Sequence, residues 1–220
     1  MSDMTARRVL IYGGEPSPYH DFPAQGPILA ELAREAGWEP ELTCDGDAFL
    51  PARVAPFHAV MVAASSGLLS PAQEEGLLSA VVGAPGGATG VPKGLLGVHG
   101  ATVLSSASGR YQRMIGARFL THPDVGPTGP AIRVATRRPD HPVLSGVGDF
   151  TIIDELYLLE QLSPFEVLLS ADHLGFERPL AWVKPFGQGR VCYCALGHAP
   201  EQLQHPNVRA VLKNALTWFE

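Results

Sequence analysis

Short continuous apolar runs alternate along this chain with segments whose apolar residues recur at helical spacing. Residues 8–12 (RVLIY) and 59–63 (AVMVA) are such runs, and they are typical of strands inside a sheet that is covered on both faces. In the segment 28–36 between them, apolar residues lie three and four positions apart, as in an amphipathic helix, and Gly37 is expected to end that helix. This order of strand, helix and strand predicts a parallel α/β fold.

The same alternation continues to the end of the chain. Residues 70–73 (SPAQ) combine a capping serine, a proline at the first helical position and a glutamine at the third, which predicts a helix start. Further helices are predicted over 110–119 and 208–219, and the Gly- and Pro-rich segment 83–90 is predicted to be a surface loop. The other predicted strands are a short one around Leu42 and the segments 132–134, 167–169, 180–183 and 191–196, with a loop at 172–178 and a hairpin turn at 187–189.

One tight turn is the strongest local signal for chemistry. Gly97-Val98-His99-Gly100 follows the apolar pair Leu95-Leu96 and precedes a helix-compatible segment. A sharp strand-to-helix turn of this kind displays one side chain above the sheet edge, where α/β enzymes can place a nucleophile, and glycine lets the backbone approach a ligand closely. The displayed residue here is a histidine, which favours proton transfer or binding over acyl transfer.

Length and charge narrow the classes of protein that the chain can be. Its 220 residues, 45% of them hydrophobic, can bury one core, so we expect a single domain over 1–220. A net charge of -6 with no Lys/Arg run longer than a pair argues against a nucleic-acid partner. No segment approaches the roughly 20 apolar residues of a membrane span, so we expect no membrane partner and a cytoplasmic location. Cys44, Cys192 and Cys194 are expected to be reduced, the last two as small buried hydrophobes.

Polar residues follow several of the predicted strands at the point where each strand ends. In a doubly wound sheet ligands bind outside the carboxyl ends of the strands, so these residues are expected to come together. Histidines at 58, 141, 173 and 205 lack this placement, and we expect structural roles for them. The candidate site residues are Tyr19, His20, Asp21, Ser65, Ser66, His99, His122, Asp154, Glu155, Tyr157 and His198.

Two neighbouring carboxylates and a possible metal add to this picture. Asp154 and Glu155 are adjacent, and two close carboxylates can raise one pKa and so place an acid beside a base; capping of a turn is the alternative. Histidines with a carboxylate also suit a divalent metal ion. The chain has no His-x-x-x-His spacing, so metal binding stays open, and no other cofactor is indicated.

Short motifs spread over nearly the whole chain carry a family resemblance. Together and in this order they resemble the ThuA-like family, which is named for trehalose utilisation and belongs to the class I glutamine amidotransferase-like superfamily. The resemblance implies a flavodoxin-like three-layer α/β/α sandwich with a mostly parallel sheet. The motifs are YHDF at 19–22, LGVH at 96–99, Gly116 with Phe119 and His122-Pro123, DELY at 154–157, and the stretch from Ala181-Trp182 through Gly189-Arg190-Val191 to Leu196-Gly197-His198.

The resemblance also bears on glutaminase activity, which is typical of the amidotransferase relatives. In the amidotransferase relatives the turn carries a nucleophilic cysteine, paired with a late histidine and with a carboxylate two residues beyond it. His99 and His198 occupy the first two positions here, and Glu201 lies three residues beyond His198. Without the thiol no glutaminyl thioester can form, so glutaminase activity is not expected.

The resemblance implies a role in carbohydrate metabolism, because ThuA-like proteins are associated with oxidoreductases that form 3-keto derivatives of trehalose and related disaccharides. A ketone acidifies the neighbouring C–H group, so we predict proton transfer on a keto sugar by an isomerase or lyase. His99 and His198 are the predicted acid and base. Glu155 or Asp154 is predicted to be the second base or the group that orients the histidines.

The remaining candidates are predicted to contact the substrate. His20 and His122 would donate to hydroxyl groups or to an oxyanion, and Tyr19 and Tyr157 would stack on a sugar ring. The expected partners are a small sugar and, from the family alone, a dehydrogenase; a homo-oligomer stays open. Two other hypotheses are a sugar-binding or regulatory module without catalysis and a metal-dependent hydrolase.

Overall fold

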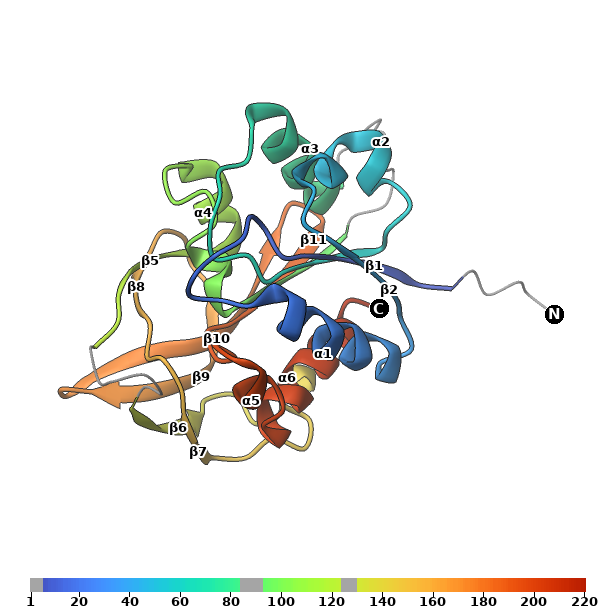
Figure 1. The fold of residues 1–220 in the computed structure, drawn as a ribbon. Coiled ribbons are helices and arrows are strands. Elements are labelled where there is room, and N and C mark those ends of the chain that lie inside the picture. Colours follow the sequence, from blue (N-terminus) through green and yellow to red (C-terminus); the bar gives the residue numbers. More distant parts are fainter. Residues whose placement is uncertain (1–5, 84–92, 124–129) are drawn as a thin grey trace.

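A nine-stranded mixed sheet with helices on both faces forms the centre of the molecule, in a computed structural model that describes residues 6–83, 93–123 and 130–220 (Figure 1). The strand order is β2-β1-β3-β4-β11-β10-β9-β6-β7. The strands are β1 Arg8–Tyr12, β2 Glu39–Thr43, β3 Ala59–Val62, β4 Gly94–Val98, β5 Ala117–Thr121, β6 Ala131–Thr136, β7 Phe150–Ile153, β8 Leu158–Gln161, β9 Glu166–His173, β10 Phe176–Phe186 and β11 Gly189–Cys194. The helices are α1 Phe22–Glu35, η1 Gly46–Phe49, α2 Pro51–Val54, α3 Pro71–Val82, η2 His99–Thr102, α4 Gly109–Ile115, η3 Pro142–Leu144, α5 Pro200–Leu203 and α6 Pro206–Trp218.

The sheet has a parallel core and an antiparallel extension. The first five strands in the order, β2 to β11, pair in parallel. Of these, β1, β3, β4 and β11 are almost entirely buried, as expected for parallel strands covered on both faces. From β11 to β7 all pairs are antiparallel, so the sheet is mixed. β5 and β8 form a separate antiparallel ribbon.

Helices cover both faces of this sheet and give the predicted three layers. α1, α5 and α6 lie together on one face, whereas α2, α3 and α4 lie on the other (Figure 1). The capping box predicted at Ser70 is present, since Ser70 accepts from the Gln73 backbone and the Gln73 side chain accepts from the Ser70 backbone. None of the helices that the structure describes is long and apolar enough to cross a lipid bilayer.

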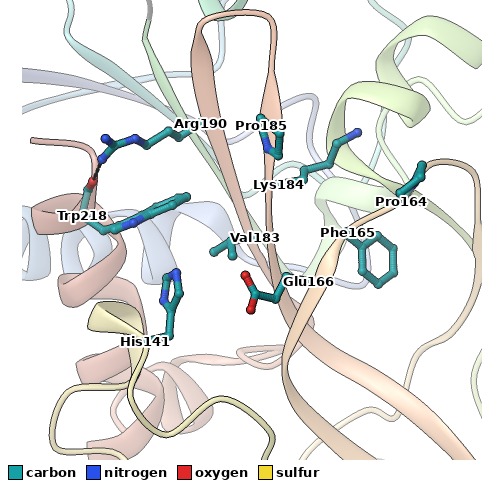
Figure 2. A pocket seen from close by; sticks show the side chains of 9 residues that line it. All are labelled: His141, Pro164, Phe165, Glu166, Val183, Lys184, Pro185, Arg190 and Trp218. Atoms are coloured by element: carbon teal, nitrogen blue, oxygen red, sulfur yellow. Dashed lines mark hydrogen bonds between the residues drawn. The ribbon is translucent and has the colours of Figure 1, made fainter.

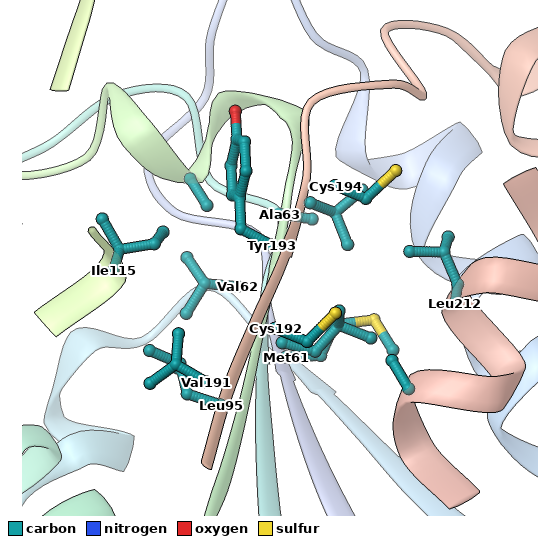
Figure 3. Packing of buried hydrophobic residues seen from close by; sticks show 14 of the residues in the cluster. Met61, Val62, Ala63, Leu95, Ile115, Val191, Cys192, Tyr193, Cys194 and Leu212 are labelled. Atoms are coloured by element: carbon teal, nitrogen blue, oxygen red, sulfur yellow. The ribbon is translucent and has the colours of Figure 1, made fainter. Parts of the chain in front are cut away.

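The central strand β11 shows how side chains divide between the two helical layers. Cys192 and Cys194 point toward Leu212 of α6, and Tyr193 and Val191 point to the opposite side (Figure 3). Both thiols are buried and free, and burial raises the pKa of Cys194 to about 12. A thiol with a raised pKa is a poor nucleophile, so these cysteines pack the core, as predicted.

Two predicted element boundaries are wrong. Residues 172–178 were expected to form a loop, but β9 runs to His173 and β10 starts at Phe176, so only Leu174 and Gly175 make the turn. The hairpin end is exposed on both faces and therefore lacks the apolar alternation that marks a strand. The helix expected over 110–119 ends at Ile115, because Gly116 adopts a φ of 114° in the left-handed region, and β5 follows.

Two further strands have no hydrophobic pattern that would predict them from the sequence. β7 and β8 are short, half-exposed strands that the sequence did not indicate, since each depends on pairing with a partner that lies outside its own segment. The loop predicted over 83–90 falls almost wholly outside the described residues, which omit 84–92.

Substitution of Gly76 by alanine is expected to lower the free energy of unfolding by about 1–3 kcal/mol, the usual cost of overpacking. An added Cβ would lie 2.1 Å from the backbone oxygen of Phe49, and a backbone atom cannot move aside as a flexible side chain can. The measurement is urea denaturation of both proteins. Gly109→Ala is the matched control, because a Cβ at Gly109 meets nothing within 4 Å; equal losses in the two variants would contradict the prediction.

Candidate functional site

Four side chains meet at the carboxyl edge of the parallel core. His20 follows β1, His99 follows β4, His198 follows β11, and Glu155 lies in the connection from β7 to β8. One nitrogen or oxygen atom from each lies within 4.8 Å of the others. These residues, the His/Glu cluster, occupy the edge at which α/β sheets bind ligands.

The turn that carries His99 is built as the sequence predicts. His99 begins η2 with a φ of 40°, a left-handed conformation that non-glycine residues seldom adopt and that recurs at functional sites. A Cβ at Gly100 would lie 2.6 Å from the Ser65 Cβ, and one at Gly97 would lie 2.7 Å from the Ile115 Cδ1. Both glycines are therefore needed for the close packing that holds the imidazole in place.

Contacts on several sides orient the His99 ring. Its Nδ1 lies 2.7 Å from the backbone oxygen of Ala195, which can only accept, so Nδ1 carries a proton and Nε2 faces the cluster. The Tyr193 hydroxyl donates to the His99 backbone oxygen at 2.7 Å, and the Tyr157 ring packs on the imidazole with centroids 4.1 Å apart. His99 thus presents a fixed nitrogen to its neighbours.

Glu155 is the anionic centre of the cluster. Its Oε2 lies 3.3 Å from His99 Nε2 and 3.2 Å from His198 Nδ1, and its Oε1 lies 3.9 Å from His122 Nε2. Burial on its own raises the pKa of Glu155, but the adjacent imidazoles of His198 and His99 outweigh it and hold the pKa well below its usual range. The carboxylate is therefore ionised near neutral pH.

The two remaining imidazoles have opposite electrostatic surroundings. Burial, helped by the neighbouring His99 and His198, lowers the pKa of His20 to about 3, so this ring is neutral near pH 7. The hydrogen bond with Glu155 is the largest cause that raises the pKa of His198. His198 Nδ1 also lies 3.2 Å from His20 Nε2, and the Gln25 side chain donates to the His198 backbone oxygen at 2.6 Å.

Asp154 supports the cluster from behind instead of entering it. Its carboxylate is buried and accepts backbone N–H groups from Gly197 at 2.7 Å, from Glu155 at 2.8 Å and from His198 at 3.2 Å. Burial raises the pKa of Asp154, whereas the nearby His99 and the three backbone hydrogen bonds work against that rise. Of the two carboxylates predicted as a base, Glu155 faces the histidines and Asp154 positions the backbone that carries Glu155 and His198.

Replacing Asp154 by asparagine is expected to lower the free energy of unfolding by about 1–3 kcal/mol, because the amide NH₂ cannot accept a backbone N–H and leaves a buried donor unpaired. Asp172→Asn is the matched control. Asp172 also accepts a backbone N–H, from Gly175 at 3.2 Å, but lies at the exposed hairpin, where changes stay within about 0.5 kcal/mol. Chemical denaturation compares the two variants, and indistinguishable midpoints would argue against the supporting role.

The other predicted substrate contacts lie at different depths. His122 is 40% exposed at the rim of the cluster, where a ligand can reach it. Tyr19 is 77% exposed, whereas Tyr157 is only 2% exposed and packs on His99, so its ring is covered by protein. Glu201 is exposed on α5, and the carboxylate beside His198 is Glu155 instead.

Gln25 is a functional neighbour that the sequence analysis missed. It is buried in α1, four residues before Leu29 and seven before Leu32, so a polar side chain lies on the apolar face of the helix. A polar residue at such a position needs a hydrogen-bond partner. That spacing is the signal that could have identified it.

A larger cavity of about 690 Å³ lies near the amino end of β11, away from the cluster (Figure 2). Its charged groups are engaged by other parts of the chain. Lys184 Nζ donates to the Arg113 backbone oxygen and to Ser163 Oγ, each at 2.6 Å, and Arg190 donates to the Trp218 backbone oxygen. Figure 2 shows side chains that frame this cavity without converging on one point, so the candidate chemistry lies at the His/Glu cluster.

Comparison with known proteins decides the family. The ThuA family, described as trehalose utilisation, matches residues 8–219. The chain belongs to the ThuA family. A search of curated proteins finds no match.

Solved structures place this ThuA chain among known folds. A ThuA-like protein from Parabacteroides merdae ATCC 43184 has a TM-score of 0.79 at 17% identity, over 98% of this chain and 90% of that one. A ThuA-like protein from Bacteroides uniformis ATCC 8492 has a TM-score of 0.76 at 17% identity, over 97% and 91%. The β-galactosidase from Bacillus circulans sp. alkalophilus has a TM-score of 0.65 at 13% identity, over 94% of this chain and 30% of that one. At these identities the likeness shows the fold, which is the predicted class I glutamine amidotransferase-like fold with a parallel core.

Proposed function

We propose that this ThuA-family chain is an enzyme of carbohydrate metabolism that moves protons on a keto derivative of a disaccharide such as trehalose. The observation that carries the proposal is the meeting of three imidazoles and one carboxylate at distances of 3.2–3.3 Å between successive members. The family description, trehalose utilisation, supports the class of substrate. A small sugar is the proposed ligand, and a dehydrogenase that forms the ketone is the proposed partner.

The exposed and the buried members of the His/Glu cluster have different proposed roles. The side chains of Glu155 and His198 are 21% and 22% exposed, whereas that of His99 is 3% exposed. A ligand above the cluster therefore meets Glu155 and His198 first. His99 lies beneath them and fixes their positions.

Glu155 is the proposed base and His198 the proposed acid. Glu155 would take the proton from the carbon beside the ketone, and the electron pair of that C–H bond would move onto the carbonyl oxygen to form an enediolate. His198 would hold the charge that develops on that oxygen. Return of a proton to the former carbonyl carbon, with loss of the hydroxyl proton on the adjacent carbon, gives an isomer. Cleavage of the bond to the glycosidic oxygen, which leaves with a proton from His198, gives an elimination product. General acid–base groups of this kind contribute roughly 100- to 10,000-fold.

Proton NMR of 3-keto-trehalose in deuterated buffer tests the proposal. We expect deuterium to enter at the carbon beside the ketone faster with the protein than in buffer alone, because a base that removes this proton lets solvent deuterium replace it. Exchange at the buffer rate, with the sugar unchanged, would overturn the proposal for this substrate. Saturable binding of the sugar without exchange would support the sugar-binding or regulatory module instead.

A further inference from the structure

The distances within the His/Glu cluster form the outline of a coordination shell. His99 Nε2, Glu155 Oε2 and His198 Nδ1 make a triangle with edges of 3.3, 3.2 and 3.3 Å. His20 Nε2 adds a fourth donor at 3.2 Å from His198 Nδ1. For bonds of 2.0–2.1 Å to a tetrahedral ion, adjacent donor atoms lie about 3.3 Å apart, which matches these contacts.

Hydrogen bonding alone leaves this arrangement unsatisfied. His99 uses its Nδ1 proton on the Ala195 oxygen, so its Nε2 presents a lone pair to the cluster. His198 Nδ1 faces His99, His20 and Glu155 at once, but one nitrogen carries at most one proton. At most one of these three contacts is then a hydrogen bond donated by His198 Nδ1, and the others can bring two lone pairs together, which repel each other. A cation at the centre would satisfy all four donors.

His99 and Asp154 make contacts of the kind that support metal ligands. A ligating histidine is oriented when its other nitrogen donates to a backbone oxygen, as His99 does to Ala195. Asp154 binds the backbone N–H groups of two cluster members, Glu155 and His198, and so holds one relative to the other. The donors also combine three imidazoles with one carboxylate, a set that suits divalent transition metals.

We infer that His20, His99, Glu155 and His198 bind one divalent transition-metal ion such as Zn²⁺. His20 Nε2, His99 Nε2, His198 Nδ1 and Glu155 Oε2 are the ligand atoms. Glu155 Oε1, which faces His122 at 3.9 Å, stays free of the ion. Binding of the ion does not depend on the proposed reaction. The further role of the ion, to hold the ketone oxygen in place of the His198 proton, rests on the proposed function.

Titration of the full-length, chelator-treated protein with Co²⁺ tests this inference, because Co²⁺ takes the same ligands as Zn²⁺ and reports them by its visible absorption. We expect one Co²⁺ per chain, displaced by Zn²⁺. His20→Ala, Glu155→Gln and His198→Ala should each weaken binding by at least the roughly 10- to 100-fold that loss of a group supporting a metal ligand costs. His173→Ala, which removes an imidazole of the β9–β10 hairpin that is not among the four donors, should bind as the parent does.

The outcomes separate this inference from the proposed function. Absence of a saturable 1:1 absorption change, or an equal affinity in the cluster variants and in His173→Ala, would overturn the metal site. Circular dichroism shows which variants keep the fold. If an alanine variant does not fold, Glu155→Gln still tests the site because it preserves the shape of the side chain. Binding of Co²⁺ without deuterium exchange would leave the metal site standing and count against the keto-sugar reaction. Deuterium exchange by the chelator-treated protein at a rate that Zn²⁺ does not change would support the keto-sugar reaction and overturn the catalytic use of the ion.

Discussion

Replacement of His99 by asparagine is expected to lower the rate of deuterium exchange on 3-keto-trehalose by about 100- to 10,000-fold, because Glu155 and His198 lose the imidazole that positions them and an acid–base pair contributes in that range. Asparagine is the sharper substitution than alanine, because it tolerates the positive φ of 40° that position 99 adopts. The backbone turn can therefore persist while the imidazole that faces Glu155 and His198 is lost. The measurement is the NMR exchange rate at saturating sugar.

His173→Asn is the matched control for this prediction. His173 lies at the end of β9 and is not a member of the His/Glu cluster, and its loss should leave the exchange rate within a factor of about two. Urea denaturation of both variants separates a lost imidazole from a lost fold. An exchange rate in His99→Asn equal to that of the parent would show that the turn serves structure and not the reaction.

Glu155→Gln is expected to lower the exchange rate by about 100-fold or more, because the amide keeps the shape of the side chain but loses its charge and its ability to take a proton. Both oxygens of Glu155 face imidazoles, His99 and His198 on one side and His122 on the other. A neutral group there also removes the main cause of the raised pKa of His198, so a smaller fraction of His198 carries the proton that the acid must supply.

Glu201→Gln is the control that distinguishes the two carboxylates near His198. Glu201 lies three residues beyond His198 in sequence but is exposed on α5, whereas Glu155 contacts the imidazole directly. We expect Glu201→Gln to exchange deuterium at the parent rate. A large loss in Glu201→Gln together with full activity in Glu155→Gln would reverse the assignment and place the reaction elsewhere on this edge.

The two halves of the sheet contribute differently to this site. The parallel core brings His20, His99 and His198 to one edge because β1, β4 and β11 run in the same direction. The antiparallel extension brings in Glu155, in the connection that follows β7. The cluster is therefore complete only when the extension docks beside the core, and Asp154 marks that junction through its bonds to Gly197 and His198.

The sequence by itself determined the parallel core and the residues at its edge. Continuous apolar runs mark β1 and β3, and a capping box marks the start of α3; these signals are local, because burial on both faces and capping act within a few residues. The same pattern placed His99 in a tight turn and set His20 and His198 after strands. Those positions depend only on where each strand ends.

Only the tertiary structure decided which carboxylate joins the histidines and how close the donors come. Glu155 lies 43 residues before His198 in sequence, and the sequence did not distinguish it from its neighbour Asp154. β7, β8 and the exposed end of the β9–β10 hairpin were unreadable for the same reason. Their stability comes from pairing and packing across the molecule, and such long-range contacts leave no periodic mark on the segments that make them.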